Sequence, residues 1–267
     1  MRVLSILSLA VVAAGCSSSA RGAPAPWRRV VLVELYTSQG CSSCPPADAF
    51  VRELPRLGFG RDRVVPLTFH VDYWDRLGWK DPFSSRAFTD RQEWYASSTK
   101  LRSPDGSAGL DGLYTPQMIV DGAVQFSGQR RETAAQEIGR AAQRPPAFDL
   151  AVRATVRGST VELSVDVPGA GSARPDRDWR LVAALMAEDA RTAIQRGENA
   201  GEVLEEAAVV RALSERAPLP LSRGPLRIQL LKPADLSWSS VDLVVFAQSE
   251  VTREIGAVRL IEARELR

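Results

Sequence analysis

The sequence predicts an α/β domain over residues 28–144, followed by a small all-β, sandwich-like domain over residues 145–267. Near the beginning, two apolar segments of strand length bracket a helical segment, which is the pattern of a β-α-β unit with parallel strands. After residue 145, seven short apolar segments follow one another without a convincing helix between them, as in a β-sandwich. With 267 residues, 45% of them hydrophobic, the chain is long enough for two modest domains.

The β-α-β unit is predicted from three segments. Residues 30–36 and 64–71 are apolar and have strand length, and the first of them is rich in valine. Residues 44–57 place apolar side chains at helical spacing, and Pro45 and Pro46 suit the first turn, where no N–H donor is needed. We therefore expect two parallel strands joined by one crossover helix.

The rest of the first part continues this alternation. Asp121-Gly122 is a strong signal for a hairpin turn, and Pro145-Pro146 follows the last helix and marks the predicted domain boundary. The remaining elements are a helix over 86–97, strands over 117–120 and 123–126, and a helix over 133–143. The resulting order, β-α-β-α-β-β-α, is the order of thioredoxin, so we expect a thioredoxin-like first domain.

Short strands are expected throughout the second part. Val161, Leu163, Val165 and Val167 alternate with other residues, which predicts one buried face, and Gly158-Ser159 before them suits a hairpin turn. The expected strands cover 151–155, 160–167, 180–187, 207–213, 226–231, 241–247 and 257–261.

Two cysteines follow the first strand, at the start of the first helix. Cys41 and Cys44 form a Cys-x-x-Cys motif, which in this position is typical of a redox-active pair. Partial positive charge and free N–H groups at the helix N-terminus favour the thiolate, which is the reactive form. We expect Cys41, on the exposed side, to be the nucleophile and Cys44 to be the resolving thiol. An inert structural disulfide is the alternative, although so short a ring restricts little chain entropy.

The N-terminus is predicted to be an export signal. Arg2 precedes an apolar stretch over 3–14, which has signal-peptide length and is too short to cross a bilayer comfortably. The stretch ends in Val12-Ala-Ala-Gly-Cys16-Ser17, which resembles a bacterial lipobox.

The lipobox resemblance implies a signal peptide over 1–16, lipid attachment at Cys16 and a flexible tether over 17–27. Ser17 after the cysteine resembles an outer-membrane sorting signal, so we expect the protein at the periplasmic face of the cell envelope. Ordinary secretion, with cleavage near Ala23, is the alternative.

Three runs resemble a known family. They are Glu34-Leu-Tyr-Thr-Ser-Gln-Gly-Cys41-Ser-Ser-Cys44-Pro-Pro-Ala-Asp48, His70-Val-Asp-Tyr-Trp74-Asp-Arg-Leu-Gly-Trp79-Lys-Asp-Pro-Phe83 and Tyr114-Thr-Pro116-Gln-Met-Ile-Val-Asp-Gly122. They resemble the exported thioredoxin-like family called domain of unknown function 1223, over roughly residues 28–260. The resemblance implies a thioredoxin-like fold and export, but no established activity.

The same resemblance implies roles near the cysteines. Thioredoxin-like proteins often hold a buried carboxylate beneath the pair, so Glu34 is expected to take the proton from Cys44, because burial favours the protonated form of an unpaired acid. A solvent-facing glutamate at a sheet edge is the alternative. Pro116 is expected to follow a cis bond and to pack against the cysteines, with the Thr115 backbone turned toward an extended peptide. A trans proline that simply opens a strand is the alternative.

Polar and aromatic residues follow the second strand, at the end of the sheet where a site is expected. Tyr73 and Trp74 are candidate substrate-binding residues, and His70 is a candidate proton relay. With Cys41 and Cys44, His70 also provides a candidate trigonal site for Cu(I). The alternatives are a hydrogen-bonded structural histidine and an aromatic cluster that belongs to the core.

Composition narrows the function. The formal net charge is +2 without a long basic run, which does not suggest a nucleic-acid partner, and no nucleotide, haem or flavin motif predicts a cofactor. We predict an exported thiol–disulfide oxidoreductase that acts on protein thiols or disulfides or on a redox partner protein. A Cu(I)-handling protein and a non-catalytic envelope binding protein are the alternatives.

Overall fold

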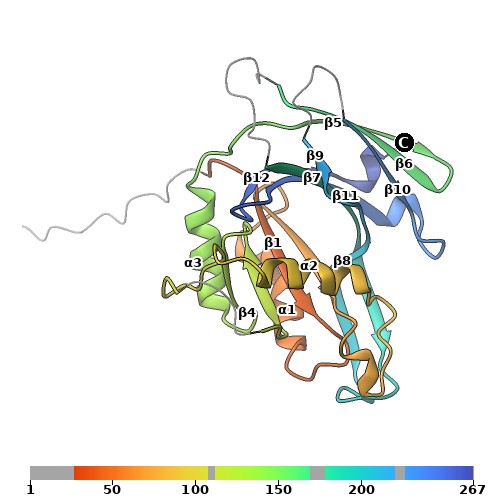
Figure 1. Ribbon diagram of the computed structural model, residues 1–267. Helices are drawn as coiled ribbons and strands as arrows, with labels where there is room; N and C mark the ends of the chain where they lie inside the picture. The colour runs from red at the N-terminus through yellow and green to blue at the C-terminus, as the bar shows by residue number, and fades with distance from the viewer. Residues whose placement is uncertain (1–26, 108–111, 169–177, 220–225, 267) are drawn as a thin grey trace, which may run out of the picture.

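The computed structural model describes residues 27–107, 112–168, 178–219 and 226–266. Over these residues the chain forms a large mixed sheet of nine strands and a smaller sheet of three strands (Figure 1). The predicted signal peptide, Cys16 and most of the predicted tether lie outside the described residues. No helix in the described part is long and apolar enough to cross a membrane.

The elements before residue 145 agree closely with the predicted ones. β1 and β2 pair in parallel, and β3 and β4 form an antiparallel hairpin, as expected. The first helix is shorter than predicted and gives way to a 3-10 turn over Leu54–Leu57, because Pro55 lacks the N–H that would continue it. The bounds are β1 (Val31–Thr37), α1 (Pro45–Glu53), β2 (Val64–His70), α2 (Arg86–Ala96), β3 (Gln117–Val120), β4 (Val124–Ser127) and α3 (Arg131–Ala142).

All seven strands predicted after residue 145 are present, and β9 is additional. The first two correspond to β5 and β6, and the third and fourth, β7 and β8, are longer than predicted. The bounds are β5 (Ala151–Arg157), β6 (Thr160–Asp166), β7 (Trp179–Ala193), β8 (Val203–Leu213), β9 (Ala217–Pro218), β10 (Leu226–Leu231), β11 (Val241–Ser249) and β12 (Ile255–Ile261).

The assembly of these strands overturns the predicted fold class. The large sheet has the order β12-β11-β7-β8-β2-β1-β3-β4, with β9 paired to β7, and the second sheet has the order β10-β6-β5. β8 joins β2 in parallel through Thr68 and Val209, and β7 and β11 follow in antiparallel pairs. A thioredoxin-like α/β domain followed by a separate all-β domain is therefore wrong, since strands from both halves of the chain build one sheet.

Burial on both faces explains why β7 and β11 extend the large sheet. Every residue of β11 is buried, as are seven consecutive residues of β7. Along β7, Leu181 and Ala183 pack in the core beneath the small sheet, whereas Val182 and Ala184 pack in the core shared with β1 and β2. A strand that is apolar on both faces needs a layer on each side, and a central position in the sheet provides it.

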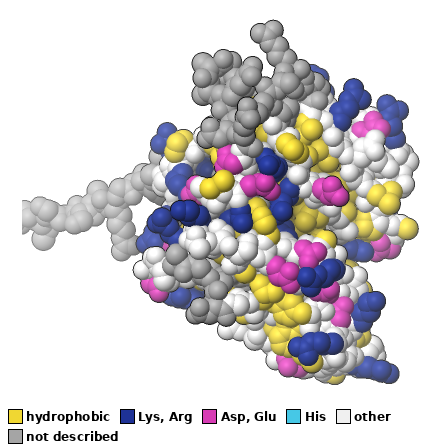
Figure 2. All heavy atoms as spheres, viewed as in Figure 1, with side chains coloured by type: hydrophobic (Ala, Val, Ile, Leu, Met, Phe, Trp, Pro, Cys, Tyr) yellow, Lys and Arg dark blue, Asp and Glu magenta, His cyan; other side chains and the backbone are white. Residues whose placement is uncertain are grey.

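Helices α1 and α2 cover opposite faces of the sheet around β1. Glu34 of β1 meets Arg91 of α2, whereas Thr37 of β1 meets Asp48 of α1. Successive strand residues point to opposite faces, so the even and odd positions of β1 face different helices. On the outer surface drawn in Figure 2, basic and acidic side chains are interspersed with hydrophobic ones.

Candidate functional site

The Cys-x-x-Cys pair lies in the turn between β1 and α1, as predicted. Cys41 and Cys44 form a disulfide, with their Cα atoms 5.5 Å apart. Cys44 directly precedes α1, and Pro45 begins the helix where a missing N–H costs nothing. Ser43 Oγ lies 3.3 Å from Cys41 Sγ, so the Ser43 hydroxyl is within hydrogen-bond distance of the sulfur inside the turn.

Both cysteines are buried, each with 0% of its surface exposed. The prediction that Cys41 lies on an exposed side is therefore wrong. The physical reason is a loop between β7 and β8 that lies over the turn. Asn199 Nδ2 of this loop donates hydrogen bonds to the main-chain oxygens of Gln39, at 2.8 Å, and of Cys41, at 3.1 Å.

A carboxylate of the same loop holds the residue between the cysteines. Glu198 accepts hydrogen bonds from the Ser42 main-chain N–H, at 3.0 Å, and from the Ser42 hydroxyl, at 2.7 Å. These two bonds lower the pKa of Glu198. We call residues 197–201 the cap loop, and its hydrogen bonds hold it against the disulfide turn.

The Thr115–Pro116 peptide bond is cis, as predicted. β3 begins directly after it, and Gln117 pairs with Tyr36 at the end of β1. The cis bond therefore lies at the same end of the sheet as the disulfide. Thr115 Oγ1 accepts a hydrogen bond from Trp74 Nε1 at 2.8 Å, so two of the predicted substrate-binding residues are in contact.

Trp74 packs against the cysteine turn, whereas Tyr73 faces α2. A Cβ atom added at Gly40 would lie 3.4 Å from Trp74 Cβ, which places the tryptophan beside the residue before the first cysteine. The Tyr73 hydroxyl donates to Gln92 of α2 at 3.3 Å, and burial raises the pKa of Tyr73 to about 12. Trp74 thus lies at the disulfide turn, whereas Tyr73 bonds to α2 and also interacts with the side chain of Thr115.

Glu34 points to the opposite face of the sheet, toward α2. Its carboxylate is buried, accepts a hydrogen bond from Arg91 Nε at 2.6 Å and accepts a further short bond from the Tyr95 hydroxyl. The expectation of an unpaired acid beneath the cysteines is wrong for Glu34, because the guanidinium balances its charge. The odd-numbered Thr37, and not Glu34, faces the helix that carries the cysteines.

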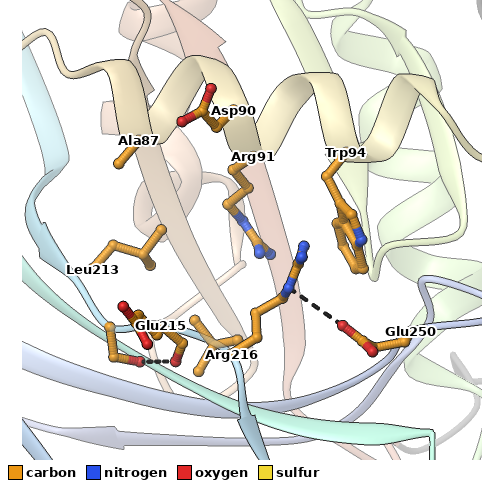
Figure 3. A pocket seen from close by; sticks show the side chains of 10 residues that line it. Ala87, Asp90, Arg91, Trp94, Leu213, Glu215, Arg216 and Glu250 are labelled. Carbon is orange, nitrogen blue, oxygen red and sulfur yellow. Dashed lines mark hydrogen bonds and ion pairs between the residues drawn. The ribbon is translucent and has the colours of Figure 1, made fainter.

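Arg91 also lines a cavity of about 430 Å³ between α2 and the sheet (Figure 3). The Arg216 guanidinium lies 4.3 Å from the centre of the Trp94 ring and pairs with Glu250 at 3.5 Å. This cavity therefore lies on the Glu34 face, and both of its arginines have carboxylate partners.

A second group of buried polar side chains lies where β1 and β2 end. His70 pairs with Thr37 in the sheet register. Its Nδ1 atom lies 2.7 Å from Asp81 Oδ2, and its Nε2 atom lies 3.7 Å from Glu206 Oε1. Gln39 joins the two carboxylates, since its main-chain N–H donates to Asp81 at 2.8 Å and its side-chain amide donates to Glu206 at 2.7 Å.

Asp48 brings this group next to the cysteines. It lies four residues after Cys44 and therefore one turn further on the same side of α1. Its Oδ2 atom accepts a hydrogen bond from Thr37 Oγ1 at 3.1 Å. Among the described residues, Asp48 Oδ1, His70 Nε2 and Glu206 Oε1 are buried without a hydrogen-bond partner.

We call Asp48, His70, Asp81 and Glu206 the acid–histidine cluster. Burial, assisted by the charge of Glu206, raises the pKa of Asp48 to about 8. Burial alone would lower the pKa of His70, but Asp81 and Glu206 outweigh it and raise that pKa to about 9. Burial also opposes ionisation of Asp81, yet His70 outweighs it and lowers the Asp81 pKa. Near neutral pH the cluster thus holds protons on both Asp48 and His70.

Sequence reasoning missed most of this cluster. A signal for Asp48 was available, because an acid four residues after Cys44 on a predicted helix shares the face of the cysteine. Glu206 carries no comparable signal. The run Gly197-Glu-Asn-Ala-Gly201 of the cap loop resembles the C-terminal half of the family called domain of unknown function 1223, but nothing in that run indicates a contact with the cysteines. Glu206 and the cap loop lie more than 150 residues from the cysteines in sequence, and the antiparallel pairing of β7 with β8 brings them back.

The copper alternative requires His70 to join the two sulfurs. His70 Nδ1 instead lies within hydrogen-bond distance of Asp81, and Nε2 lies nearest Glu206. Within the described residues, no three His, Cys, Asp or Glu side chains are placed to hold a metal ion. The geometry gives a Cu(I) site of this kind no support.

Comparison with known families gives a match over most of the chain. A family model described as protein of unknown function (DUF1223) matches residues 32–248. The chain belongs to the DUF1223 family. The family resemblance expected from the three sequence runs is therefore confirmed, while export stays a prediction. No curated protein matches this DUF1223 chain.

Two solved structures share the fold of this DUF1223 protein. A crystal structure of protein AGR_C_4864 from Agrobacterium tumefaciens has a TM-score of 0.64 and 22% sequence identity, and the alignment covers 91% of this chain and 98% of that one. HBP35 of Porphyromonas gingivalis has a TM-score of 0.61 and 12% identity, over 90% of this chain and 77% of that one. At these identities the likeness concerns the fold alone.

Proposed function

We propose that this DUF1223 protein is a thiol–disulfide oxidoreductase that acts on protein thiols through Cys41 and Cys44. The observation that carries the proposal is the buried Asp48, one helical turn from Cys44, with its pKa raised to about 8. A structural disulfide needs no proton acceptor, whereas thiol–disulfide exchange needs one whose pKa lies near the working pH.

The proposed oxidation of a substrate dithiol begins at Cys41. A substrate thiolate attacks Cys41 Sγ, the bond between Cys41 and Cys44 breaks, and its electron pair leaves on Cys44 as a thiolate. Asp48 then gives its proton to Cys44. The second substrate thiolate attacks the substrate sulfur of the mixed disulfide and releases Cys41 as a thiolate. The substrate leaves as a disulfide, and the two electrons remain on the protein dithiol.

The reverse sequence reduces a substrate disulfide. The Cys41 thiolate attacks a substrate sulfur, and the substrate's second sulfur leaves as a thiolate. Cys44 then gives its proton to the Asp48 carboxylate and attacks Cys41 Sγ, which releases the first substrate sulfur. Asp48 is therefore the proton donor in one direction and the acceptor in the other, and His70 and Glu206 are its charged neighbours in the cluster.

Access to the disulfide is the second part of the proposal. Both cysteines are buried beneath the cap loop, so exchange requires the bonds from Asn199 and Ser42 to open. The cis peptide bond and Trp74 border the same turn. We propose that an extended segment of a substrate protein takes the place of the cap loop and lies along Thr115.

The reduction potential of the disulfide tests the redox function. The protein is equilibrated with reduced and oxidised glutathione and analysed by mass spectrometry. A potential in the range of exchange enzymes supports the proposal, and its value gives the preferred direction. Cys41→Ser is expected to abolish exchange, and Cys44→Ser is expected to trap mixed disulfides. A pair that resists reduction, with a potential below about −300 mV, would identify a structural disulfide instead.

We also propose that the protein is exported and anchored to the periplasmic face of the outer membrane by a lipid on Cys16. The lipobox-like run that ends at Cys16 and Ser17 supports this localisation. Replacement Cys16→Ala should move the protein from the membrane fraction to the soluble fraction. Unchanged fractionation would contradict the anchor and leave the redox proposal intact.

A further inference from the structure

A basic cavity lies at the end of the large sheet that is remote from the disulfide. It has a volume of about 480 Å³. Three cations, one carboxylate and one hydroxyl contribute to its lining: Lys100, Arg102, Arg144, Glu254 and Thr252. No role in the proposed redox chemistry falls on any of these residues.

The fold fixes the main chain of Arg102 and the side chain of Arg144. The Arg102 main chain bridges β4, since its N–H donates to Ala123 O at 3.0 Å and its carbonyl accepts from Gln125 N–H at 2.7 Å. The Arg144 side chain is held by Asp121 Oδ2 at 3.3 Å and by Glu254 Oε1 at 3.2 Å. The cavity is therefore lined by side chains whose attachment points are rigid, which reduces the entropic cost of binding.

The positive charge around this cavity exceeds the negative charge. Asp121 is shared between Arg144 and the nearby Arg29, which lies 3.4 Å from the same carboxylate oxygen. Burial lowers the pKa of Arg29, and the charge of Arg144 lowers it further, so the two guanidiniums are close enough to repel each other. Lys100 and Arg102 are exposed, and among the described residues no carboxylate forms an ion pair with either.

The cavity lies close to the point where the described chain begins, after the predicted N-terminal tether. Arg28 N–H donates to Ala142 O at 2.9 Å, so the described chain begins beside the end of α3, two residues before Arg144. In Figure 2, several basic side chains lie on the side of the molecule where the described chain begins, with acidic ones among them. β1 then runs the length of the sheet, about 23 Å for seven residues, before the chain reaches Cys41.

We propose that this cavity binds the phosphate group of an anionic phospholipid headgroup, with Lys100, Arg102 and Arg144 as its ligands. Guanidinium and ammonium groups pair with phosphate oxygens, and the Thr252 hydroxyl adds a neutral donor. The choice of a lipid as the source of the phosphate rests on the anchor proposed for Cys16, whereas the anion site rests on the contacts alone. Docked in this way, the protein presents its disulfide away from the bilayer.

Vesicle co-sedimentation tests this site. The chain from residue 16 onward, with Cys16→Ser so that no lipid is attached, is mixed with phosphatidylcholine vesicles that contain or lack phosphatidylglycerol. We expect binding only to the anionic vesicles. The double variant Lys100→Gln/Arg102→Gln should lose about thirtyfold in vesicle affinity, because each Lys or Arg near an anionic surface contributes about fivefold to that affinity. The double variant Arg76→Gln/Lys80→Gln is the matched control, since it removes the same charges from exposed positions after β2.

Added salts separate a phosphate site from diffuse attraction. Inorganic phosphate should displace the protein from vesicles at concentrations where chloride of equal ionic strength does not. Equal displacement by both salts, or equal losses in the two double variants, would overturn the site. If calorimetry detects binding of inorganic phosphate but the protein does not bind anionic vesicles, the anion site stands and a lipid is excluded as the source of the phosphate. None of these outcomes depends on the redox activity of Cys41 and Cys44, so the two proposals fail separately.

Discussion

Two groups of buried charged side chains lie on opposite faces of β1, and they differ in how far their positive and negative charges balance. On the α2 face, one carboxylate, Glu34, meets one guanidinium, Arg91. On the α1 face, the acid–histidine cluster sets three carboxylates against a single imidazole. The first group has every charge compensated, which suits a structural role. The second retains titratable protons beside a disulfide, which suits chemistry.

The largest effect expected from one substitution at a single pH concerns the balanced group. Replacement Arg91→Met leaves Glu34 buried without its counter-charge, which should lower the free energy of unfolding by about 3–5 kcal/mol. Urea denaturation measures it. The control is Arg52→Met, which breaks an exposed pair with Glu205 and should cost about 1 kcal/mol or less. Similar losses in both variants would mean that the buried pair is not a structural element.

The next effect concerns Asp48 and pH. The folded protein keeps a proton on Asp48 up to pH about 8, whereas the unfolded chain releases it near 3.8. The folded state therefore binds more protons between these values, and stability falls as pH rises, by about 1.4 kcal/mol per pH unit from this group. Asp48→Asn should remove that contribution.

Urea denaturation of wild type and Asp48→Asn across a pH series checks this expectation. Below pH 6, His70 is charged in both the folded and the unfolded state, and Glu206, whose pKa is raised by burial, titrates in both proteins. The difference between the two pH profiles therefore reports Asp48. His70 contributes stability that is lost only as pH rises toward about 9, and it does so in both proteins. Parallel pH profiles for the two proteins would show that Asp48 is ionised in the folded state.

The smallest effect concerns access to the disulfide. Replacement Asn199→Ala removes two hydrogen bonds from the cap loop to the turn, which should speed reduction by dithiothreitol about tenfold. Gln195→Ala, an exposed position just before the cap loop, is the control and should react like wild type. An unchanged rate in Asn199→Ala would indicate that the cap loop does not limit access.

The local elements were predictable from sequence because they depend on short-range patterns. Valine-rich runs, the Asp121-Gly122 turn and the Cys-x-x-Cys motif each fix structure over a few residues, and the structure agrees. The assembly was not predictable in this way. Continuous apolar runs in β7 and β11 indicate burial on both faces, but they do not specify whether the layer on the second face comes from another sheet or from helix α2.

The error over Glu34 has a similar cause. A burial argument selects an acidic residue on the strand before the cysteines, but the side of the sheet depends on register. Glu34 and Thr37 point to opposite faces, and only the Thr37 face carries α1 and the cysteines. Arg91, the partner that neutralises Glu34, comes from a helix 57 residues away.

The pH dependence of the step in which Cys44 resolves a mixed disulfide tests whether Asp48 is the proton acceptor. Reduced protein is mixed with oxidised glutathione, so that Cys41 attacks its disulfide, forms the mixed disulfide and releases one glutathione. Release of the second glutathione is then followed by stopped flow in wild type, Asp48→Asn and Glu34→Gln. We expect release in wild type and Glu34→Gln to accelerate through pH about 8, as Asp48 becomes able to accept a proton. Asp48→Asn should be about a hundredfold slower and lack that rise. Identical profiles for wild type and Asp48→Asn would show that Asp48 is not the proton acceptor of Cys44.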